Sequence, residues 1–389
     1  MSVPPLAVIG GGQLARMMAQ AAVGLGVPIR LLAEGPDVSA AQVVPDSTVG
    51  DHRDLADLRS VSEGCAVVTF DHEHVPTEHL LTLAAEGHAC RPGPAALVHA
   101  QDKAVMRSRM ADLGVPGPRN RVVAAPQQVA DFADSVGGFP VVLKTTRGGY
   151  DGKGVWVVSS AEDSAPAFAA AASGVRILAE ERVDFRRELA ALVARSPSGQ
   201  VAAYPVVESV QRDGVCSEVT APAPDLDPGL AVQAQRIAMR VAGELDVTGI
   251  LAVELFETRD GRVLVNELAM RPHNTGHWSM DGAVTGQFEN HLRAVLDLPL
   301  GSPAARQQWS VMVNILGGDH GELSEDLYGG YPHVFARDPF LKVHLYGKEV
   351  RPGRKVGHVT AYGEDLDDVR SRARHAAAWF RGDLGMESE

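Results

Sequence analysis

Two glutamates that could bind a metal ion stand in apolar runs on either side of Asp260-Gly261, a pair that predicts a β-hairpin turn. If these two residues form the turn, Arg259 faces Arg262 and Glu254 stands directly opposite Glu267, with Cβ atoms about 5 Å apart. Carboxylates so close repel each other unless a cation lies between them, and Mg2+ prefers oxygen ligands. The spacing therefore predicts a magnesium site. A slipped register, or a raised pKa on one glutamate, would also relieve the repulsion.

A second candidate site is the glycine-dense stretch of residues 148–154, which follows an apolar run ending at Lys144. Glycine lets backbone N–H groups approach an anion closely, and Lys144 and Lys153 add positive charge, so the stretch predicts a phosphate-binding loop. Neither GxxxxGK[ST] nor a Rossmann fingerprint matches it. A mobile turn with solvated lysines is the alternative. The glycines are Gly148, Gly149, Gly152 and Gly154.

A loop rich in hydrogen-bond donors, residues 270–279, follows the strand that carries Glu267. Arg271 offers a planar fork for an oxyanion. His273 could stabilise charge or move a proton. The loop is therefore expected to face the metal carboxylates, with a simple hydrogen-bonded connector as the alternative.

The chain begins with a pattern typical of a strand, a tight turn and a helix: Leu6 to Ile9, three glycines, then Gln13 to Gly24. The helix N-terminus places the amides near Gln13 and Leu14 where the helix dipole favours an anion. A dinucleotide site, with Glu34 as the ribose carboxylate, is the rival interpretation, although GxGxxG spacing is lacking.

Four polar residues, Asp71-His72-Glu73-His74, follow the expected strand Val67 to Phe70. They lie at the carboxyl end of that strand, where open α/β sheets bind ligands. A solvated loop is an equally good interpretation of the pattern.

The C-terminal part contains a local cationic cluster in a chain whose formal net charge is −13. Residues 340–346 and 356–362 are expected to form strands, with Pro352-Gly353 at the turn. Lys348, Arg351, Arg354 and Lys355 then crowd one end of the hairpin, which favours binding of an anion. A solvated basic turn is the alternative.

Length and composition limit the possible functions. A chain of 389 residues predicts two or three domains, and the net charge of −13 argues against general nucleic-acid binding. The three cysteines form no CxxC motif, and no signal sequence or long apolar run is present, so a cytoplasmic protein without a membrane segment is expected. The α/β pattern changes near residues 91–100 to mixed short strands and helices, which indicates a following α+β module.

The order of these motifs resembles that of the ATP-grasp enzymes. Within that superfamily the chain is similar to the 5-(carboxyamino)imidazole ribonucleotide synthases, a family of ATP-dependent carboxylases of purine biosynthesis. The resemblance is carried by GGYDGKG, RPHNTGHW and KEVRPGRKVGH, and it runs from Gly10 to His358. It implies an ATP-grasp fold of class α/β and α+β, with an N-terminal Rossmann-like domain (1–98), an ATP-grasp domain (99–298) and a small β-rich C-terminal domain (299–389).

The family implies a reaction in which ATP phosphorylates bicarbonate to carboxyphosphate and the carboxyl group passes to aminoimidazole ribonucleotide. Magnesium, or manganese, would be held by Glu254 and Glu267. The implied ATP-site residues are Lys103, Lys144, Gly148, Gly149, Tyr150, Asp151, Gly152, Lys153, Gly154, Glu180, Glu181, Arg182, Val183, Glu188, Gln211, Asn266 and Glu267. The implied catalytic residues are Tyr150, Asp151, Arg271, His273 and Lys348, and the ribonucleotide would meet Gln13, Leu14, Glu73, Asn274, Lys348, Arg354 and Lys355.

The chain departs from the family pattern at a few positions. His99 stands where an arginine is usual, Gln211 where histidine is common, and residues 71–74 replace a more typical Glu-Phe-Glu-Asn. Two other functions stay open: a formate-dependent glycinamide ribonucleotide formyltransferase and a non-catalytic nucleotide-binding regulator. The resemblance also implies a homodimer.

Overall fold

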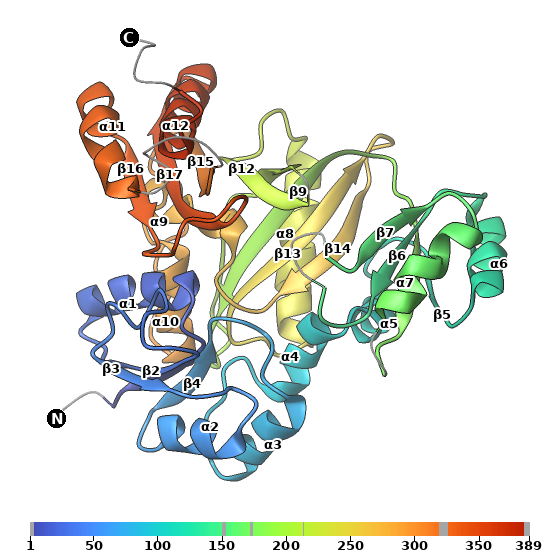
Figure 1. Ribbon diagram of the computed structural model, residues 1–389, viewed down its shortest axis with the longest axis horizontal. Helices are drawn as coiled ribbons and strands as arrows, with labels where there is room; N and C mark the ends of the chain where they lie inside the picture. The colour runs from blue at the N-terminus through green and yellow to red at the C-terminus, as the bar shows by residue number, and fades with distance from the viewer. Residues whose placement is uncertain (1–3, 150–152, 172–173, 213, 319–325, 385–389) are drawn as a thin grey trace.

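The computed structural model describes residues 4–149, 153–171, 174–212, 214–318 and 326–384. These residues form three β-sheets flanked by helices (Figure 1). Tyr150 and Asp151 of the expected catalytic set, and Gly152, lie outside the described residues. In the described part, none of the helices combines the length and apolar character that crossing a membrane requires.

The N-terminal unit is a parallel four-stranded sheet in the order β3-β2-β1-β4. Every residue of the central strand β1 is fully buried, as expected for a parallel strand covered on both faces. The predicted strand, glycine turn and helix are confirmed. The elements are β1 (Leu6–Ile9), α1 (Gln13–Leu25), β2 (Ile29–Ala33), β3 (Asp46–Val49), α2 (Leu55–Ser62), β4 (Val67–Phe70), α3 (Thr77–Ala85) and α4 (Pro94–Gln101).

A small antiparallel sheet, in the order β5-β8-β6-β7, carries the glycine loop between two of its strands. Lys144 pairs with Val155, so the predicted succession of strand, loop and strand is confirmed. Figure 1 shows this sheet, with α6 and α7, at one end of the molecule. The elements are α5 (Lys103–Asp112), β5 (Asn120–Val123), α6 (Pro126–Val136), β6 (Val141–Thr145), β7 (Val155–Val158), η1 (Glu162–Ser164), α7 (Ala165–Ala170) and β8 (Ile177–Glu181).

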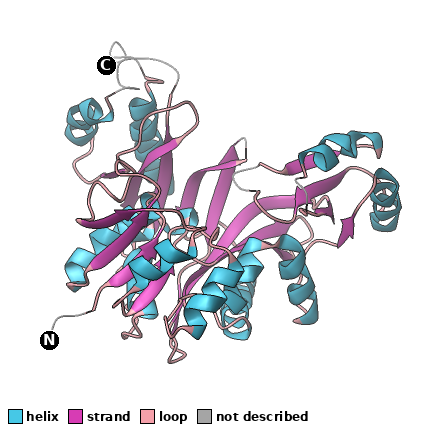
Figure 2. Ribbon diagram, turned by 60° about the horizontal axis from the view of Figure 1, so that its bottom comes forward, coloured by secondary structure: helices cyan, strands magenta, loops and turns pink. Residues whose placement is uncertain are grey.

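The largest sheet runs through the middle of the molecule in the order β14-β13-β9-β11-β12-β15-β17-β16, with β10 paired to β9 (Figure 2). Helix α8 packs on β9 and β13 through Ala234, Ile237, Ala238 and Val241. Its first elements are β9 (Phe185–Arg195), β10 (Val201–Ala203), β11 (Val207–Arg212), β12 (Val215–Ala221), α8 (Pro228–Glu244), β13 (Gly249–Thr258) and β14 (Val263–Ala269).

The C-terminal strands continue that same sheet, because β12 pairs with β15. Their hairpin also reaches the N-terminal unit, where Ser39 Oγ donates to the Tyr346 carbonyl at 2.6 Å and Gln42 Nε2 to the Gly347 carbonyl at 2.7 Å. The remaining elements are η2 (Asn274–Gly276), α9 (Ser279–Gly282), α10 (Gln287–Val295), β15 (Trp309–Leu316), η4 (Leu327–Gly330), α11 (Tyr331–Arg337), β16 (Lys342–Leu345), β17 (Lys355–Gly363) and α12 (Leu366–Arg381).

The expected domain boundaries at 98/99 and 298/299 stay a prediction. Hydrophobic contacts cross the first of them, since one apolar cluster joins residues of the N-terminal sheet, α5 and β13. The backbone pairing of β12 with β15 crosses the second. The units are therefore fused by shared core and shared sheet rather than joined by a linker.

The carboxylate hairpin has a different turn from the one predicted. The loop has three residues, 259–261, with Thr258 N donating to Arg262 O at 2.9 Å, so the prediction that Arg259 faces Arg262 is wrong. A bulge then follows in β14: Glu257 pairs with Val263 and Leu255 with Val265, but Glu254 pairs with Glu267. The extra residue is Asn266, and it restores the predicted alignment of the two glutamates.

The three-residue turn requires a left-handed residue, and Gly261 has φ +77°. Gly261→Ala should therefore destabilise the protein by about 1 kcal/mol. Gly243→Ala is the matched control, because Gly243 is helical and has open space where a Cβ would lie, and it should be neutral or stabilise by up to about 1 kcal/mol. Urea unfolding measures both, and equal effects of the two substitutions would contradict the turn assignment.

Candidate active site

Glu254 and Glu267 face each other across β13 and β14, as the sequence predicted. Burial, together with the negative charges of Glu267 and Glu188, raises the pKa of Glu254 to about 7. Glu188, Gln211, Glu254 and Asn266 line one small hollow. Carboxylates and an amide oxygen around a common space are a suitable donor set for a hard divalent cation.

Two lysines from separate elements converge on the β14 side of this space. Lys103, the first residue of α5, contacts the Glu267 carboxylate, and Lys144 Nζ at the end of β6 donates to Asn266 Oδ1 at 3.1 Å. These side chains are mostly buried. The bulge thus places the Asn266 side chain where Lys144, near the end of β6, can donate a hydrogen bond to it.

Glu180 fixes the position of Lys144 through an ion pair. Its carboxylate is 2% exposed and lies 2.7 Å from Lys144 Nζ and 2.5 Å from Arg107 Nε. Burial alone would raise the pKa of Glu180, but the charges of Arg107 and Lys144 lower it to about 2. Arg107 also donates to the carbonyls of Val265 and Asn266 at 2.7 and 2.8 Å, so it binds the bulge as well.

Arg271 is held by a carboxylate from the N-terminal unit. Its Nε lies 2.7 Å from Glu73 Oε2, and the other Glu73 oxygen accepts from the Met270 amide at 3.2 Å. Nη1 donates to the Pro272 carbonyl at 3.1 Å. Among the acceptors that the structure describes, none is bonded to Nη2, which leaves that group for an oxyanion.

His273 lies beside the metal carboxylates. Its Nε2 is 3.4 Å from Glu254 Oε1, and its Nδ1 is 2.8 Å from Thr275 Oγ1. Burial, together with the nearby charges of Arg271 and Lys355, lowers the pKa of His273 well below its usual value. His273 is therefore neutral at physiological pH. Gln287 fixes the loop by bonding both the amide and the carbonyl of His273 at 2.8 Å.

The described part of the glycine loop has a backbone that only glycine fits comfortably. Gly148 and Gly154 have φ values of +76° and +72°. A Cβ on Gly149 would lie 2.8 Å from the Lys153 carbonyl, and one on Gly154 would lie 2.5 Å from Thr145 Oγ1. Positive φ accounts for Gly148, and close packing of the two loop ends accounts for Gly149 and Gly154.

The N-terminus of α1 is already partly neutralised by protein groups. Asp71 accepts from the amides of Gly12 at 3.1 Å and Ala15 at 2.7 Å, and Glu34 accepts from Gly11 at 3.0 Å. The amides of Gln13 and Leu14 have no acceptor among the described residues. Lys348 of the C-terminal hairpin contacts Gln13 Oε1, so residues 335 positions apart meet here.

Other expected site residues have protein partners or lie at the surface. Glu181 bonds Arg119 at 2.6 Å, Arg182 is exposed, and Arg354 donates to the Glu349 carbonyl at 3.2 Å. Asn274 differs, because its Nδ2 is buried without a hydrogen-bond partner in the described part of the chain. The ligand roles predicted for all these residues stay predictions.

Arg107 and Gln287 were missed by sequence reasoning. Arg107 is 3% exposed on α5, between buried Met106 and Met110. Its position four residues after Lys103 places both side chains on one face of α5, and this spacing was a usable signal. A buried arginine also requires a carboxylate partner. Gln287 carried no local signal, since its contacts with the backbone of His273 depend on how the loop of residues 270–279 folds back toward α10.

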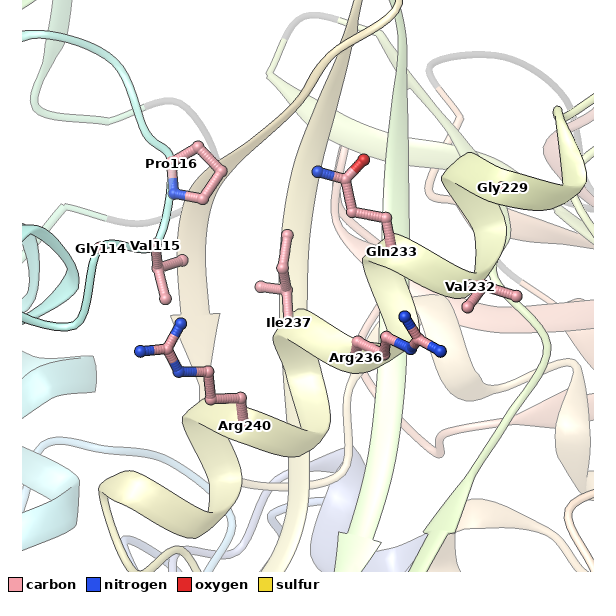
Figure 3. Close-up of a pocket in the computed structure, with 9 residues that line it drawn as sticks. All are labelled: Gly114, Val115, Pro116, Gly229, Val232, Gln233, Arg236, Ile237 and Arg240. Carbon is pink, nitrogen blue, oxygen red and sulfur yellow. The ribbon is translucent and has the colours of Figure 1, made fainter.

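A separate hollow of about 240 Å³ lies between α8 and the segment 114–116 (Figure 3). Arg240 reaches toward Val115, and Arg236 points toward Val232. The lining contains none of the predicted site residues and no carboxylate. This hollow therefore lacks the carboxylates and lysines that meet around Glu254.

Three family models cover most of the chain: a ribonucleotide synthetase preATP-grasp domain (residues 4–101), an ATP-grasp domain (108–288) and a phosphoribosylaminoimidazole carboxylase C-terminal domain (310–372). With the three-sheet fold and the carboxylate and lysine site, these matches define an enzyme of the ATP-grasp class.

The chain is 54% identical to the N5-carboxyaminoimidazole ribonucleotide synthase of Mycobacterium tuberculosis, over 97% of this chain and 88% of that protein. A solved synthetase of this name in complex with ADP matches with 34% identity and a TM-score of 0.88, covering 99% of both chains. The Aspergillus clavatus enzyme, in complex with ADP and 5-aminoimidazole ribonucleotide, matches with 29% identity and a TM-score of 0.87, covering 97% and 99%. The chain therefore belongs to the N5-carboxyaminoimidazole ribonucleotide synthases, enzymes of purine biosynthesis.

The raised pKa of Glu254 predicts a pH-dependent stability in the absence of magnesium. The folded protein holds a proton at Glu254 up to about pH 7, whereas the unfolded chain releases it near 4.5. This contribution is complete below pH 4.5 and is lost as pH rises through 7. Glu267→Gln removes the negative charge that helps to raise the pKa of Glu254, so it should weaken the dependence of stability on pH.

The free energy of unfolding, measured in urea from pH 5 to 8 with a chelator present, tests this. Glu244→Gln, a surface change at the end of α8, is the control and should keep the wild-type slope. An unchanged slope in Glu267→Gln would show that the two carboxylates do not interact.

Proposed function

We propose that this chain carboxylates 5-aminoimidazole ribonucleotide with bicarbonate at the expense of ATP, giving N5-carboxyaminoimidazole ribonucleotide, ADP and phosphate. The observation that carries the proposal is the meeting of Glu254 and Glu267 with Lys103 and Lys144, close enough to Arg271 for its charge to act on Glu254, in a member of this family. Solved relatives from Aspergillus clavatus are complexes with ATP, or with ADP and 5-aminoimidazole ribonucleotide.

In the first step a bicarbonate oxygen attacks the γ-phosphorus of ATP, so carboxyphosphate forms and ADP leaves. Lys103 and Lys144 would hold the phosphates, because phosphoryl transfer depends chiefly on positioning and charge neutralisation. Magnesium, when bound by Glu254, Glu267 and Asn266, would neutralise phosphate charge. Manganese has the same preference for these donors.

In the second step the exocyclic amine forms a bond to the carboxyl carbon, the bond from that carbon to the phosphate oxygen breaks, and the departing phosphate accepts the proton that the amine loses. Arg271 Nη2 would bind the carboxyphosphate oxyanion, with Glu73 holding the guanidinium in place. Neutral His273 can donate a hydrogen bond from Nε2–H to the Glu254 carboxylate without adding charge to the site. Tyr150 and Asp151 would complete the cover over the reacting atoms, because exclusion of water protects a labile acyl phosphate.

The ribonucleotide would lie between the N-terminal unit and the C-terminal hairpin. The free amides of Gln13 and Leu14, at the α1 N-terminus, suit a phosphate or hydroxyl group. Lys348 already reaches Gln13 across this junction. Arg354 and Lys355, nearby on the hairpin, would bind the 5′-phosphate, and Asn274 Nδ2 would donate a further hydrogen bond.

The deciding experiment measures ADP release with magnesium, ATP and bicarbonate. Addition of aminoimidazole ribonucleotide should stimulate release strongly and yield the carboxylated product. Stimulation by formate with glycinamide ribonucleotide would instead identify the formyltransferase activity. ATP binding without any turnover would identify the nucleotide-binding regulator. Either result would overturn the proposal.

A substitution in the C-terminal hairpin tests the phosphate assignment. Arg354→Ala should raise the KM for aminoimidazole ribonucleotide about tenfold or more, because a charge-assisted hydrogen bond contributes roughly 1.5 to 3 kcal/mol. The KM for ATP should stay nearly constant. Arg351→Ala is the control, since Arg351 pairs with Glu349 at 2.6 Å on the surface. Loss of ATP affinity alone in Arg354→Ala would contradict the assignment.

The proposal extends to a homodimer in the cytoplasm, on the strength of family membership. Sedimentation velocity of the full chain tests the assembly, and a monomer at micromolar concentration would contradict it.

A further inference from the structure

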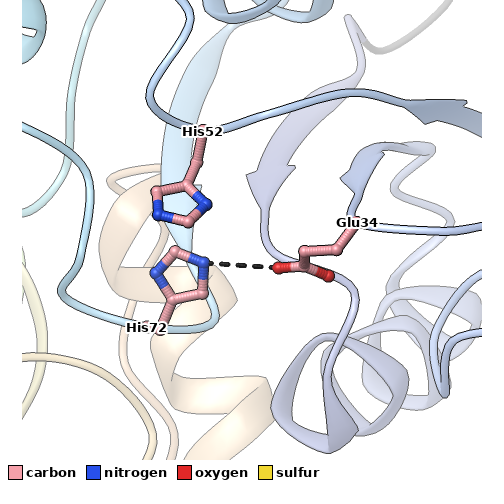
Figure 4. A group of neighbouring side chains, drawn as sticks. All are labelled: Glu34, His52 and His72. Carbon is pink, nitrogen blue, oxygen red and sulfur yellow. Dashed lines mark ion pairs between the residues drawn. The ribbon is translucent and has the colours of Figure 1, made fainter.

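Three potential metal ligands meet at the edge of the N-terminal sheet, away from the glutamate pair. Glu34 directly follows β2, His72 follows β4, and His52 lies shortly after β3. Because these strands are parallel, their carboxyl ends meet at one edge, and Figure 4 shows the three side chains turned toward one another. One ligand atom from each lies within 4.8 Å of the others.

The distances suit a tetrahedral ion. His72 Nε2 lies 3.5 Å from Glu34 Oε1. Ligand bonds of about 2.0 to 2.1 Å at tetrahedral angles place neighbouring donors about 3.4 Å apart. The His52 and His72 rings meet edge to face with centroids 4.6 Å apart, and a His52 ring nitrogen lies within 4.8 Å of the other two donor atoms, so His52 can supply a third ligand. His72 Nε2 is also buried without a hydrogen-bond partner among the described residues.

Neighbouring groups already orient two of the ligands. Glu34 Oε2 accepts from the Gly11 amide at 3.0 Å, which leaves Oε1 turned toward His72. The His72 ring packs against Gly10, where a Cβ would lie 2.7 Å from its Cδ2. Such outer contacts hold metal ligands in place in known sites.

One contact must change when a metal binds. His72 Nδ1 accepts from the His74 amide at 3.2 Å, but a neutral imidazole bound through Nε2 carries its proton on Nδ1. That amide therefore has to find another acceptor. His74 is exposed, so water can take the place of Nδ1.

From this geometry we propose that Glu34, His52 and His72 form a second metal site, selective for Zn2+ or a similar borderline divalent ion. Two imidazoles and one carboxylate favour such an ion, whereas Mg2+ prefers oxygen donors alone. Three protein ligands leave a fourth position for water. His72 lies between Asp71, which accepts from the α1 N-terminus, and Glu73, which holds Arg271. A bound ion therefore braces the segment that links these two contacts.

The test uses the metal-stripped full-length protein, ZnCl2 and a chromophoric chelator as competitor. His72→Phe, His52→Phe and Glu34→Gln should each weaken one zinc site by more than the ~10- to 100-fold lost with an outer contact. His74→Gln is the matched control, because His74 stacks on His72 at 5.2 Å but is outside the ligand set. His333 and His375, whose Nε2 atoms are 3.1 Å apart, could bind zinc separately, so all variants are also made in a His375→Gln background.

A structural readout accompanies the titration. Anomalous scattering at the zinc edge should show a peak between the three side chains in wild-type crystals soaked with ZnCl2. Thermal unfolding without metal checks that each variant folds. Equal zinc affinity of wild type and all three ligand variants, or an anomalous peak only at His375, would overturn the proposal and leave the cluster as an ion pair.

Discussion

Repulsion between two carboxylates on facing strands is the constraint on which the site depends. Glu254 and Glu267 are aligned by the backbone, so neither can move away without breaking the sheet pairing. Partial burial strengthens their interaction, because the protein screens charge less than water does. Positive groups must therefore surround them, and Lys103 and Lys144 arrive from two other elements to do so. The charge repulsion between Glu254 and Glu267 thus makes this pair of strands suitable for binding a cation.

The second requirement is to hold those positive groups still. Glu180 and Arg107 form a buried ion pair beneath Lys144, and Arg107 also ties the pair to the bulged strand. A buried pair of this kind contributes little net stability, since desolvation offsets the attraction. The ion pair instead fixes the relative positions of Lys144, Asn266 and the strand that carries Glu267. The same principle recurs at Glu73, which fixes Arg271 from a different unit.

Local sequence patterns predicted several of the elements and the facing positions of Glu254 and Glu267. The apolar runs with Gly148–Gly154 between them predicted β6, its loop and β7, and residues 6 to 24 predicted the first strand, its glycine turn and α1. The glutamate pairing was predicted correctly, but from a turn that was one residue too short. The bulge at Asn266 compensated for that error. Neither deviation has a strong local signal, because a two-residue and a three-residue turn both accept Asp-Gly. Contacts such as Arg107 with Glu180 and Lys348 with Gln13 depend on the tertiary arrangement, which no local pattern contains.

The continuous sheet from β14 to β16 has a consequence for how such chains can be recombined. Strand β12 gives its outer edge to β15, so a cut near residue 299 would leave a row of unpaired backbone groups at the centre of the molecule. Exposed edges of that kind recruit strands from other chains. The C-terminal segment is thus not a detachable module. Gene fusions or domain exchanges should succeed only when β12 and β15 are inherited together.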